Sequence, residues 1–377
     1  MTSEPGSNPS ILKLSTRPEE FFDSILALSE QAAAGRRIER YFLLDGHVVC
    51  LEFAGEALAE PLCRALAHLA CEPAVEALRI RAWDSASTGV PWPNLPWFDY
   101  EGFVNSRGER IDNLYTPRGD IRGYNTDRIQ THIGDRLFSL LDAERNLGIY
   151  WCHDAAELPI YERGAPLRSI LHWWLRRRGL QMIHAGAVGN ANGAVLLSGK
   201  GGSGKSTTAL TCLNSPLLYL SDDYSLVNAG PEPYVCSIYN TAKVRPDNLH
   251  RVPFLAGALT NRESLEFEKA LFFLHEHFPG RLVSRLPLRA VLLPCVTGKP
   301  DTWLEPADPA ESLASIGLSS LHQLSGSGGA LLGTVKRLLA SVPSWHLRLG
   351  TDLEQIPRVI GALIDGEPVP RAPVRDA

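Results

Sequence analysis

The residues best suited to chemistry form a glycine-rich stretch near the middle of the chain. Residues 199–207 read Gly-Lys-Gly-Gly-Ser-Gly-Lys-Ser-Thr and follow the apolar run 194–197. Glycines let backbone N–H groups turn inward around phosphate oxygens, and the N-terminus of a following helix adds partial positive charge. The pattern predicts a phosphate-binding P-loop, in which Lys205 reaches the β- and γ-phosphates of ATP and Ser206 ligates Mg²⁺. The predicted nucleotide-binding residues are Gly199, Lys200, Gly201, Gly202, Ser203, Gly204, Lys205, Ser206 and Thr207.

The same glycines also satisfy the G-x-G-x-x-G pattern of dinucleotide-binding proteins, at Gly199, Gly201 and Gly204. A dinucleotide turn has no use for a lysine and a hydroxyl at the positions of Lys205 and Ser206. The closing Gly-Lys-Ser therefore favours the P-loop interpretation.

Two carboxylates follow the next apolar segment. The short run 218–221 ends in Asp222 and Asp223, and the chain is apolar again at 224–227. In an α/β sheet, ligands bind at the carboxyl ends of parallel strands, so the P-loop and the acids should face one crevice as a βαβ unit. Asp222 is expected to accept the proton of an attacking hydroxyl and Asp223 to bind Mg²⁺. The alternative is that the pair only caps a turn, where Asp is common.

These segments together resemble a known family. Residues 183–188 (Ile-His-Ala-Gly-Ala-Val), the P-loop strand at 193–199, the P-loop and the Asp-Asp pair occur in the order of the C-terminal catalytic domain of HPr kinase/phosphorylase. The resemblance covers roughly residues 165–365 and extends to offshoot serine kinases of peptide-tailoring gene clusters, such as those for lasso peptides. The long glycine-containing signature of HPr kinases after the acids is missing, and residues 237–246 stand in its place.

The resemblance implies an HPr kinase-like P-loop domain, with a mixed sheet and helices, that uses ATP and Mg²⁺. It implies that His184 lies at the phosphate site, although a lone strand histidine is more often a core residue. Phosphoryl transfer also needs cations around the moving charge, which makes Lys243 and Arg245 candidates in the segment after the acids. A solvated loop is the alternative for both.

The composition is that of an ordinary cytoplasmic enzyme. The chain has 377 residues, of which 44% are hydrophobic and 21% charged, which is enough for two cores. A formal net charge of -5 gives no basic footprint for nucleic acid. No apolar stretch is long enough to span a bilayer, and the first ten residues lack a secretory pattern, so we expect a cytoplasmic protein without membrane contact.

Three segments are expected along the chain. Residues 1–160 should form an α+β domain with a hairpin at 41–53 around Asp-Gly and a long irregular loop at 84–128, rich in tryptophan at 90–98. That loop either helps to recognise the substrate or packs down on the surface. Residues 161–365 should form the kinase domain, and residues 366–377, rich in proline, a disordered tail.

The expected activity is transfer of the γ-phosphoryl group of ATP to a hydroxyl acceptor, Ser or Thr of a protein or peptide. A small-molecule kinase of the shikimate or gluconate type is a second interpretation, because such enzymes also carry acids soon after the first helix. A protein that binds ATP without transferring phosphate is a third. The sequence leaves homo-oligomer formation open.

Overall fold

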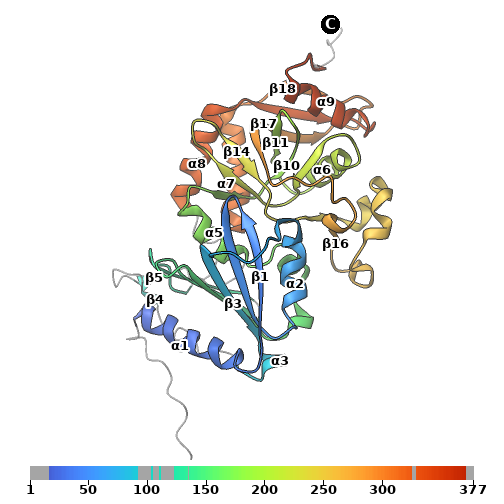
Figure 1. Ribbon diagram of the computed structural model, residues 1–377. Coiled ribbons are helices and arrows are strands. Elements are labelled where there is room, and N and C mark those ends of the chain that lie inside the picture. The colour runs from blue at the N-terminus through green and yellow to red at the C-terminus, as the bar shows by residue number, and fades with distance from the viewer. Residues whose placement is uncertain are drawn as a thin grey trace, which may run out of the picture. The chain divides into compact units, whose positions relative to one another are not determined.

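A computed structural model describes residues 17–91, 103–104, 110–111, 123–134, 136–324 and 328–370 (Figure 1). The chain divides into two compact units that interleave in sequence. The smaller unit comprises Met1–Glu39, Cys50–Ala59 and Ala77–Glu157, and the larger unit comprises Arg40–Val49, Glu60–Glu76 and Leu158–Ala377. Most of the expected irregular loop at 84–128 and of the tryptophan-rich stretch at 90–98 lies outside the described residues. Among the described residues, no helix combines the length and apolarity needed to cross a membrane.

A six-stranded sheet has the order β1-β2-β3-β8-β7-β6. Its first two strands form the hairpin expected around Asp45 and Gly46, which is confirmed. Both turn residues have positive φ, 45° and 82°, as the common tight hairpin turn requires. β3 and β8 pair in parallel, whereas β6, β7 and β8 pair antiparallel. The strands are β1 (Arg37–Leu44), β2 (His47–Ala54), β3 (Leu78–Asp84), β6 (Ile129–Gly134), β7 (Leu137–Asp142) and β8 (Leu147–Cys152).

Helix α1 (Pro18–Ala32) belongs to the smaller unit and buries Phe21, Phe22 and Ile25 in its core. The other regular segments that precede the larger unit's sheet are short. They are α2 (Ala59–Cys63), the 3₁₀ helix η1 (Arg64–Leu69), α3 (Ser85–Thr88), β4 (Phe103–Val104), β5 (Arg110–Ile111), η2 (Ala155–Glu157) and α4 (Ile160–Gly164). The sequence pattern predicts one helix over 57–69. The structure divides it into α2 and η1, and Pro61 falls in α2.

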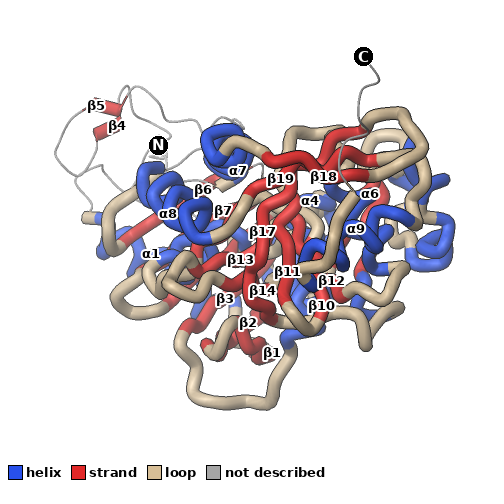
Figure 2. Tube along the Cα trace, turned by 90° about the horizontal axis from the view of Figure 1, so that it is seen from above, coloured by secondary structure: helices blue, strands red, loops and turns tan. Residues whose placement is uncertain are grey.

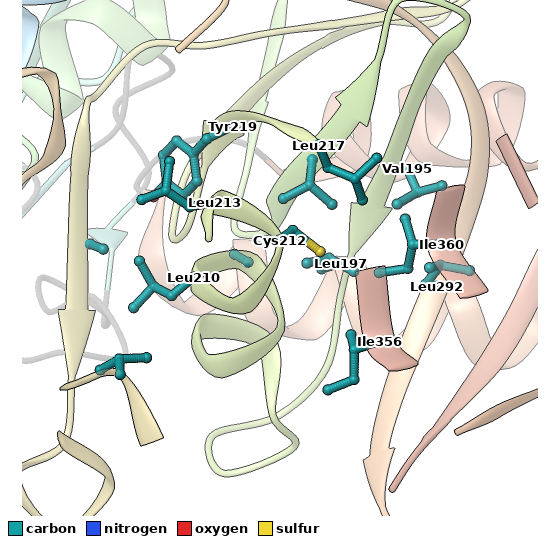
Figure 3. Close-up of a cluster of buried hydrophobic side chains, with 14 of the residues drawn as sticks. Val195, Leu197, Leu210, Cys212, Leu213, Leu217, Tyr219, Leu292, Ile356 and Ile360 are labelled. Atoms are coloured by element: carbon teal, nitrogen blue, oxygen red, sulfur yellow. The ribbon is translucent and has the colours of Figure 1, made fainter. Parts of the chain in front are cut away.

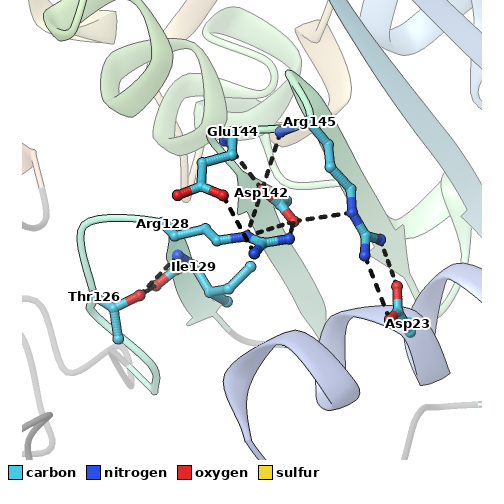
Figure 4. A network of polar contacts seen from close by, with 7 residues as sticks. All are labelled: Asp23, Thr126, Arg128, Ile129, Asp142, Glu144 and Arg145. Carbon is cyan, nitrogen blue, oxygen red and sulfur yellow. Dashed lines mark hydrogen bonds and ion pairs between the residues drawn. The ribbon is translucent and has the colours of Figure 1, made fainter.

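A buried carboxylate organises the polar side of the smaller unit (Figure 4). Asp142, at the end of β7, is 0% exposed and pairs with Arg128 at 2.9 Å and with Arg145 at 3.4 Å. The backbone amides of Glu144 and Arg145 donate to its other oxygen. Arg145 also pairs with Asp23 on α1. A buried charge is tolerated only when it is paired and hydrogen-bonded. This cluster therefore has a structural role, which is to link α1 to strands β6–β8.

The larger unit is built on a mixed nine-stranded sheet, as expected for the fold class (Figure 2). The order is β12-β10-β11-β17-β14-β13-β9, with β19 on β17 and β18 on β19. The long strand β17 pairs in parallel with β11 and β19, and antiparallel with β14. The strands are β9 (Gln181–Ile183), β10 (Gly186–Asn190), β11 (Gly193–Leu197), β12 (Leu218–Ser221), β13 (Ser225–Asn228), β14 (Tyr234–Cys236), β17 (Arg285–Val296), β18 (Trp303–Pro306) and β19 (Ser344–Leu349).

The expected βαβ unit is interrupted. β11 and β12 both pair antiparallel with β10, which lies between them. They therefore run parallel to each other without pairing, and the segments that follow both strands leave the same edge of the sheet. The sequence prediction of a parallel sheet at this point was wrong in its pairing, because β10 is inserted, but the P-loop and the acids still share an edge.

Helices and short 3₁₀ segments surround this sheet. A two-stranded sheet of β15 (Thr241–Val244) and β16 (Ala270–Phe273) carries the excursion 245–269 between its strands. The helices are α5 (Arg168–Arg176), α6 (Lys205–Leu213), α7 (Pro309–Gln323), α8 (Gly328–Ser341) and α9 (Gln355–Asp365). The 3₁₀ helices are η3 (Pro246–Arg251), η4 (Pro253–Ala258), η5 (Arg262–Ser264) and η6 (Leu274–Glu276).

The core of the larger unit is packed around α6 (Figure 3). Leu210 and Leu213 of α6 lie among buried side chains of β11, β17 and α9, including Leu197 and Ile360. Full burial of a leucine contributes about 2 kcal/mol, so these contacts hold the helix after the P-loop firmly on the sheet. Beyond α9, the carbonyl of Pro370 accepts from the amide of Leu304 at 3.0 Å. Residues 371–377 of the expected tail lie outside the described residues.

Candidate functional site

The P-loop joins β11 to α6, and its backbone requires glycine at two positions. Gly202 and Gly204 have φ of 84° and 105°, in the region that favours glycine. A Cβ on Gly204 would collide with Leu349, and one on Gly199 would come within 2.5 Å of the Ser203 hydroxyl. The loop is therefore a tight cradle that ends at the N-terminus of a helix, the geometry that binds phosphate.

Lys205 is the first residue of α6 and folds back over the loop. Its Nζ donates to the carbonyl of Gly199 and lies 3.4 Å from that of Lys200. Burial lowers the pKa of Lys205, whereas the carboxylates of Asp222 and Asp223 raise it. The ammonium is thus directed at the loop carbonyls.

The two acids after β12 occupy different environments. Asp222 is 3% exposed, and its Oδ2 accepts from the backbone amide of Lys243 at 3.0 Å. Its Oδ1 is buried and makes no hydrogen bond of normal geometry to any described residue, although the Ser206 hydroxyl is near enough to lower the pKa of the carboxyl. Burial, followed by the neighbouring charge of Asp223, raises the pKa of Asp222 overall.

Asp223 is the more accessible acid, with 26% of its side chain exposed. Its Oδ2 lies 2.6 Å from Nζ of Lys243, and its Oδ1 lies 2.8 Å from Nε2 of His184. Burial alone would raise the pKa of Asp223, but the Lys243 ammonium, and then His184, lower it well below its usual range. Asp223 is a carboxylate at neutral pH that two partners hold in place.

His184 lies just after β9, with its ring held on both sides. Nε2 contacts Asp223, Nδ1 contacts the hydroxyl of Ser319, and the backbone amide donates to the hydroxyl of Ser320 at 2.9 Å. Both serines belong to α7. His184 therefore contacts one of the two acids, and α7 supports its ring and backbone.

A second set of contacts lies behind the acids. The hydroxyl of Tyr224, the residue after Asp223, accepts from the guanidinium of Arg168 at 3.2 Å and donates to Gln323 at 3.2 Å. Its ring centroid is 5.6 Å from that of His184. Arg168 is only 5% exposed and lies 4.0 Å from Glu162. This network restricts the movement of the backbone that carries the acids.

These groups surround one pocket of about 380 Å³. The excursion 245–269 supplies part of its wall, including Arg245, which is paired with Asp247 at 3.4 Å. Asp222, Gly199 and Ser203 do not line the pocket, and of these three only Asp222 is buried. The residues that line the pocket include His184, Lys200, Gly201, Gly202, Gly204, Lys205, Ser206, Thr207, Asp223, Lys243, Arg245, Asn248, Arg251, Lys269, Leu349 and Leu353.

The structure thus brings together every residue that the sequence nominated for catalysis, either in the pocket or, for Asp222, just behind it. Sequence reasoning missed Asn248, Arg251 and Lys269, which line the same pocket. It also missed the α7 serines, because α7 was not predicted. The signal was present, since Asp308 caps the helix and Pro309 occupies its first turn.

No model of a protein family matches the chain, and no curated protein matches it. Among solved structures, the chain is similar to one described as the Hpr(Ser) kinase/phosphatase from Coxiella burnetii. The match covers 49% of this chain and 95% of that chain, at 10% sequence identity and a TM-score of 0.27.

Proposed function

We propose that the protein is an ATP-dependent, Mg²⁺-requiring kinase that transfers the γ-phosphoryl group to a hydroxyl of Ser or Thr in a protein or peptide. One observation carries the proposal. Lys205 and Ser206, at the phosphate-binding end of α6, share a pocket with Asp223, whose oxygens are held by His184 and Lys243. Phosphoryl transfer needs this combination of a phosphate cradle, cations and an oriented carboxylate.

The residues present fit a magnesium nucleotide. Gly204 leaves no room for a side chain at the start of α6, and Lys205 is directed at the loop carbonyls, where a polyphosphate is the stronger partner. Mg²⁺ in such sites is usually bound by one or two carboxylates together with substrate phosphates and water. Among the described residues, no group of three or more His, Cys, Asp or Glu forms a metal cage, which fits that arrangement.

The geometry favours roles for the two acids that are the reverse of those expected from the sequence, where Asp222 was the proton acceptor and Asp223 the Mg²⁺ ligand. Asp222 is buried behind Ser206 with an oxygen that lacks a normal hydrogen bond, so we assign Asp222 and Ser206 to the magnesium side. Asp223 lines the pocket, so we assign it to the acceptor hydroxyl. Bound magnesium would neutralise charge that develops on the phosphates.

Asp223 acts as follows in this proposal. Its low pKa keeps it ionised, so at neutral pH it accepts a hydrogen bond from the acceptor hydroxyl and orients that oxygen toward the phosphoryl group. In a loose transition state the hydroxyl proton moves late, so a weakly basic carboxylate is sufficient. Lys205 and Arg245 offset the negative charge on the transferred group, and His184 and Lys243 fix the carboxylate.

The resemblance to peptide-tailoring kinases favours a polypeptide hydroxyl, such as the last residue of a ribosomal precursor peptide. We propose that residues 1–160 help to present it, because a P-loop unit alone binds nucleotide without selecting a polypeptide. A small-molecule acceptor remains the alternative. A non-transferring ATP sensor would not need both acids and their partners at the pocket.

The proposal is tested by incubating the protein with ATP labelled with ³²P at the γ-position and with the polypeptides encoded by neighbouring genes. We expect label on Ser or Thr of one polypeptide, located by mass spectrometry, with wild-type protein and not with Lys205→Ala. Label only on a small metabolite from cell extract would move the proposal to the small-molecule alternative. ATP binding without any labelled acceptor would favour the sensor.

A further inference from the structure

A second cavity, of about 650 Å³, adjoins the P-loop pocket within the larger unit. Arg251 and Leu353 line both cavities. The second cavity extends along α6, where Thr211 and Asn214 line it, toward the outer face of α9. None of the residues assigned above to phosphoryl transfer lines it, so its role is separate from the chemical step.

The position of the cavity along α6 relates it to the phosphate site. Thr207 lines the P-loop pocket and Thr211 lines the second cavity. Residues four apart lie on one face of a helix, about 6 Å apart along its axis. A ligand whose phosphates lie at the N-terminus of α6 therefore enters the second cavity if it extends along that face.

The walls of the cavity suit a flat, mostly apolar group with polar edges. Phe254 of η4 is half-buried and its ring packs edge-on against Phe278 at 6.0 Å, so the ring is held in a fixed orientation. The guanidinium of Arg251 is exposed and has no ion pair among the described residues. Aromatic faces and guanidinium groups stack on planar rings, and the Asn214 amide offers a donor and an acceptor. The charged pair Arg358–Glu354, 3.1 Å apart, compensates itself.

We propose that this second cavity is the nucleoside subsite of the ATP proposed above, with the base against Phe254 and the phosphates in the P-loop. The proposal rests on the proposed function, which it deepens by assigning the part of the substrate that the P-loop does not bind. The volume of the second cavity lies in the range of pockets that enclose small ligands.

The test compares two probes, Mg-ATP and Mg-tripolyphosphate, which share the phosphate chain but differ in the nucleoside. Binding to the full chain is measured by calorimetry. Phe254→Ala removes the ring, and Ala362→Trp fills the cavity from α9 without touching the P-loop. The matched control is Phe267→Ala, because Phe267 lies on the same excursion, is 85% exposed and lines neither cavity.

We expect both cavity variants to weaken ATP binding about tenfold, the usual effect of losing one aromatic contact, and to leave tripolyphosphate binding unchanged. Phe267→Ala should change neither. Unchanged ATP affinity in both folded cavity variants overturns the proposal, and so does a selective loss of acceptor phosphorylation, which would assign the cavity to the acceptor. If Phe254→Ala does not fold, Ala362→Trp decides alone. Failure of nucleotide binding itself looks different, because wild-type protein would then bind neither probe, and failure of phosphoryl transfer alone would leave binding of both probes intact.

Discussion

Lys243 touches both acids of the site: its backbone amide lies 3.0 Å from Oδ2 of Asp222 and its Nζ lies 2.6 Å from Oδ2 of Asp223. The side chains of Lys243 and Asp223 are 11% and 26% exposed. A single residue on β15 therefore fixes the positions of both carboxylates and the charge of one.

Removing the Lys243 ammonium should destabilise the protein and shift its acid response. Asp223 has a folded pKa below its unfolded value, so its ionisation contributes stability that is present above about pH 4 and is lost as pH falls through the lower folded pKa. Lys243→Met removes the main cation beside Asp223, so the folded pKa of Asp223 should rise. We expect a loss of about 2 kcal/mol at pH 7, less than for a fully buried pair, measured by urea unfolding.

The double variant Lys243→Met, Asp223→Asn provides the control for that prediction. Because it removes both charges, much of the lost stability should return. Additive losses in the double variant would show that the two side chains do not interact as described.

Nucleotide binding should depend on Lys205. In Lys205→Ala the cation directed at the loop is lost, while the core around α6 is unchanged. We expect the increase in melting temperature caused by Mg-ATP to vanish and the apo melting temperature to stay within a few degrees of wild type. A wild-type increase with Mg-ATP would contradict the P-loop assignment.

Asp222→Asn should stabilise the protein and weaken its binding of Mg²⁺. Because burial raises its folded pKa, Asp222 contributes stability below its unfolded pKa that is lost as pH rises through the folded value. The carboxyl of Asp222 therefore contributes less stability at pH 7 than at low pH, and the neutral amide should raise the free energy of unfolding at pH 7. The apparent affinity for Mg²⁺ should weaken about tenfold or more, as a Mg²⁺ titration at fixed ATP would measure. Lower stability of Asp222→Asn together with an unchanged affinity for Mg²⁺ would contradict the assignment of Asp222 to the magnesium side.

A buried histidine outside the site should contribute part of the acid sensitivity of the fold. His172 on α5 is 0% exposed, and neither ring nitrogen has a hydrogen-bond partner among the described residues. Burial, followed by Arg176 and Arg168, lowers the pKa of His172 from 6.5 to about 3. The folded state thus holds it neutral, and stability present above pH 6.5 is lost as pH falls toward 3.

At pH 5 this loss amounts to about 2 kcal/mol relative to neutral pH. His172→Phe should remove that part of the acid sensitivity when unfolding free energies at pH 7 and pH 5 are compared. An unchanged difference between the two pH values would show that His172 is not the group responsible. His153→Ala serves as a control, because His153 is exposed.

Local chemistry made part of this site predictable. The loop from Gly199 to Thr207 carries its geometry in its own residues, because glycine, lysine and hydroxyl positions follow from what a phosphate needs. The turn at Asp45 and Gly46 is equally local. His184 was nominated only through a family resemblance, since nothing in its neighbours distinguishes it from a core histidine.

The remaining features depend on long-range pairing that no local pattern reports. The insertion of β10 between β11 and β12 is a property of the sheet, and so is the pairing of Val244 with Ala270 that brings Lys269 to the pocket. The contact of Ser319 with His184 spans 135 residues. Roles for Asp222 and Asp223 could not be assigned from sequence, because they depend on which carboxylate is buried.

The central claim is that Asp223, held by His184 and Lys243, orients the acceptor hydroxyl for phosphoryl transfer from ATP in the P-loop. The most direct test measures ATP affinity and single-turnover transfer to the labelled acceptor in the same samples of wild type and Asp223→Asn. The account predicts ATP affinity within a few-fold of wild type and transfer slower by about 10²-fold or more. Transfer at the wild-type rate in Asp223→Asn, with ATP bound, would contradict it.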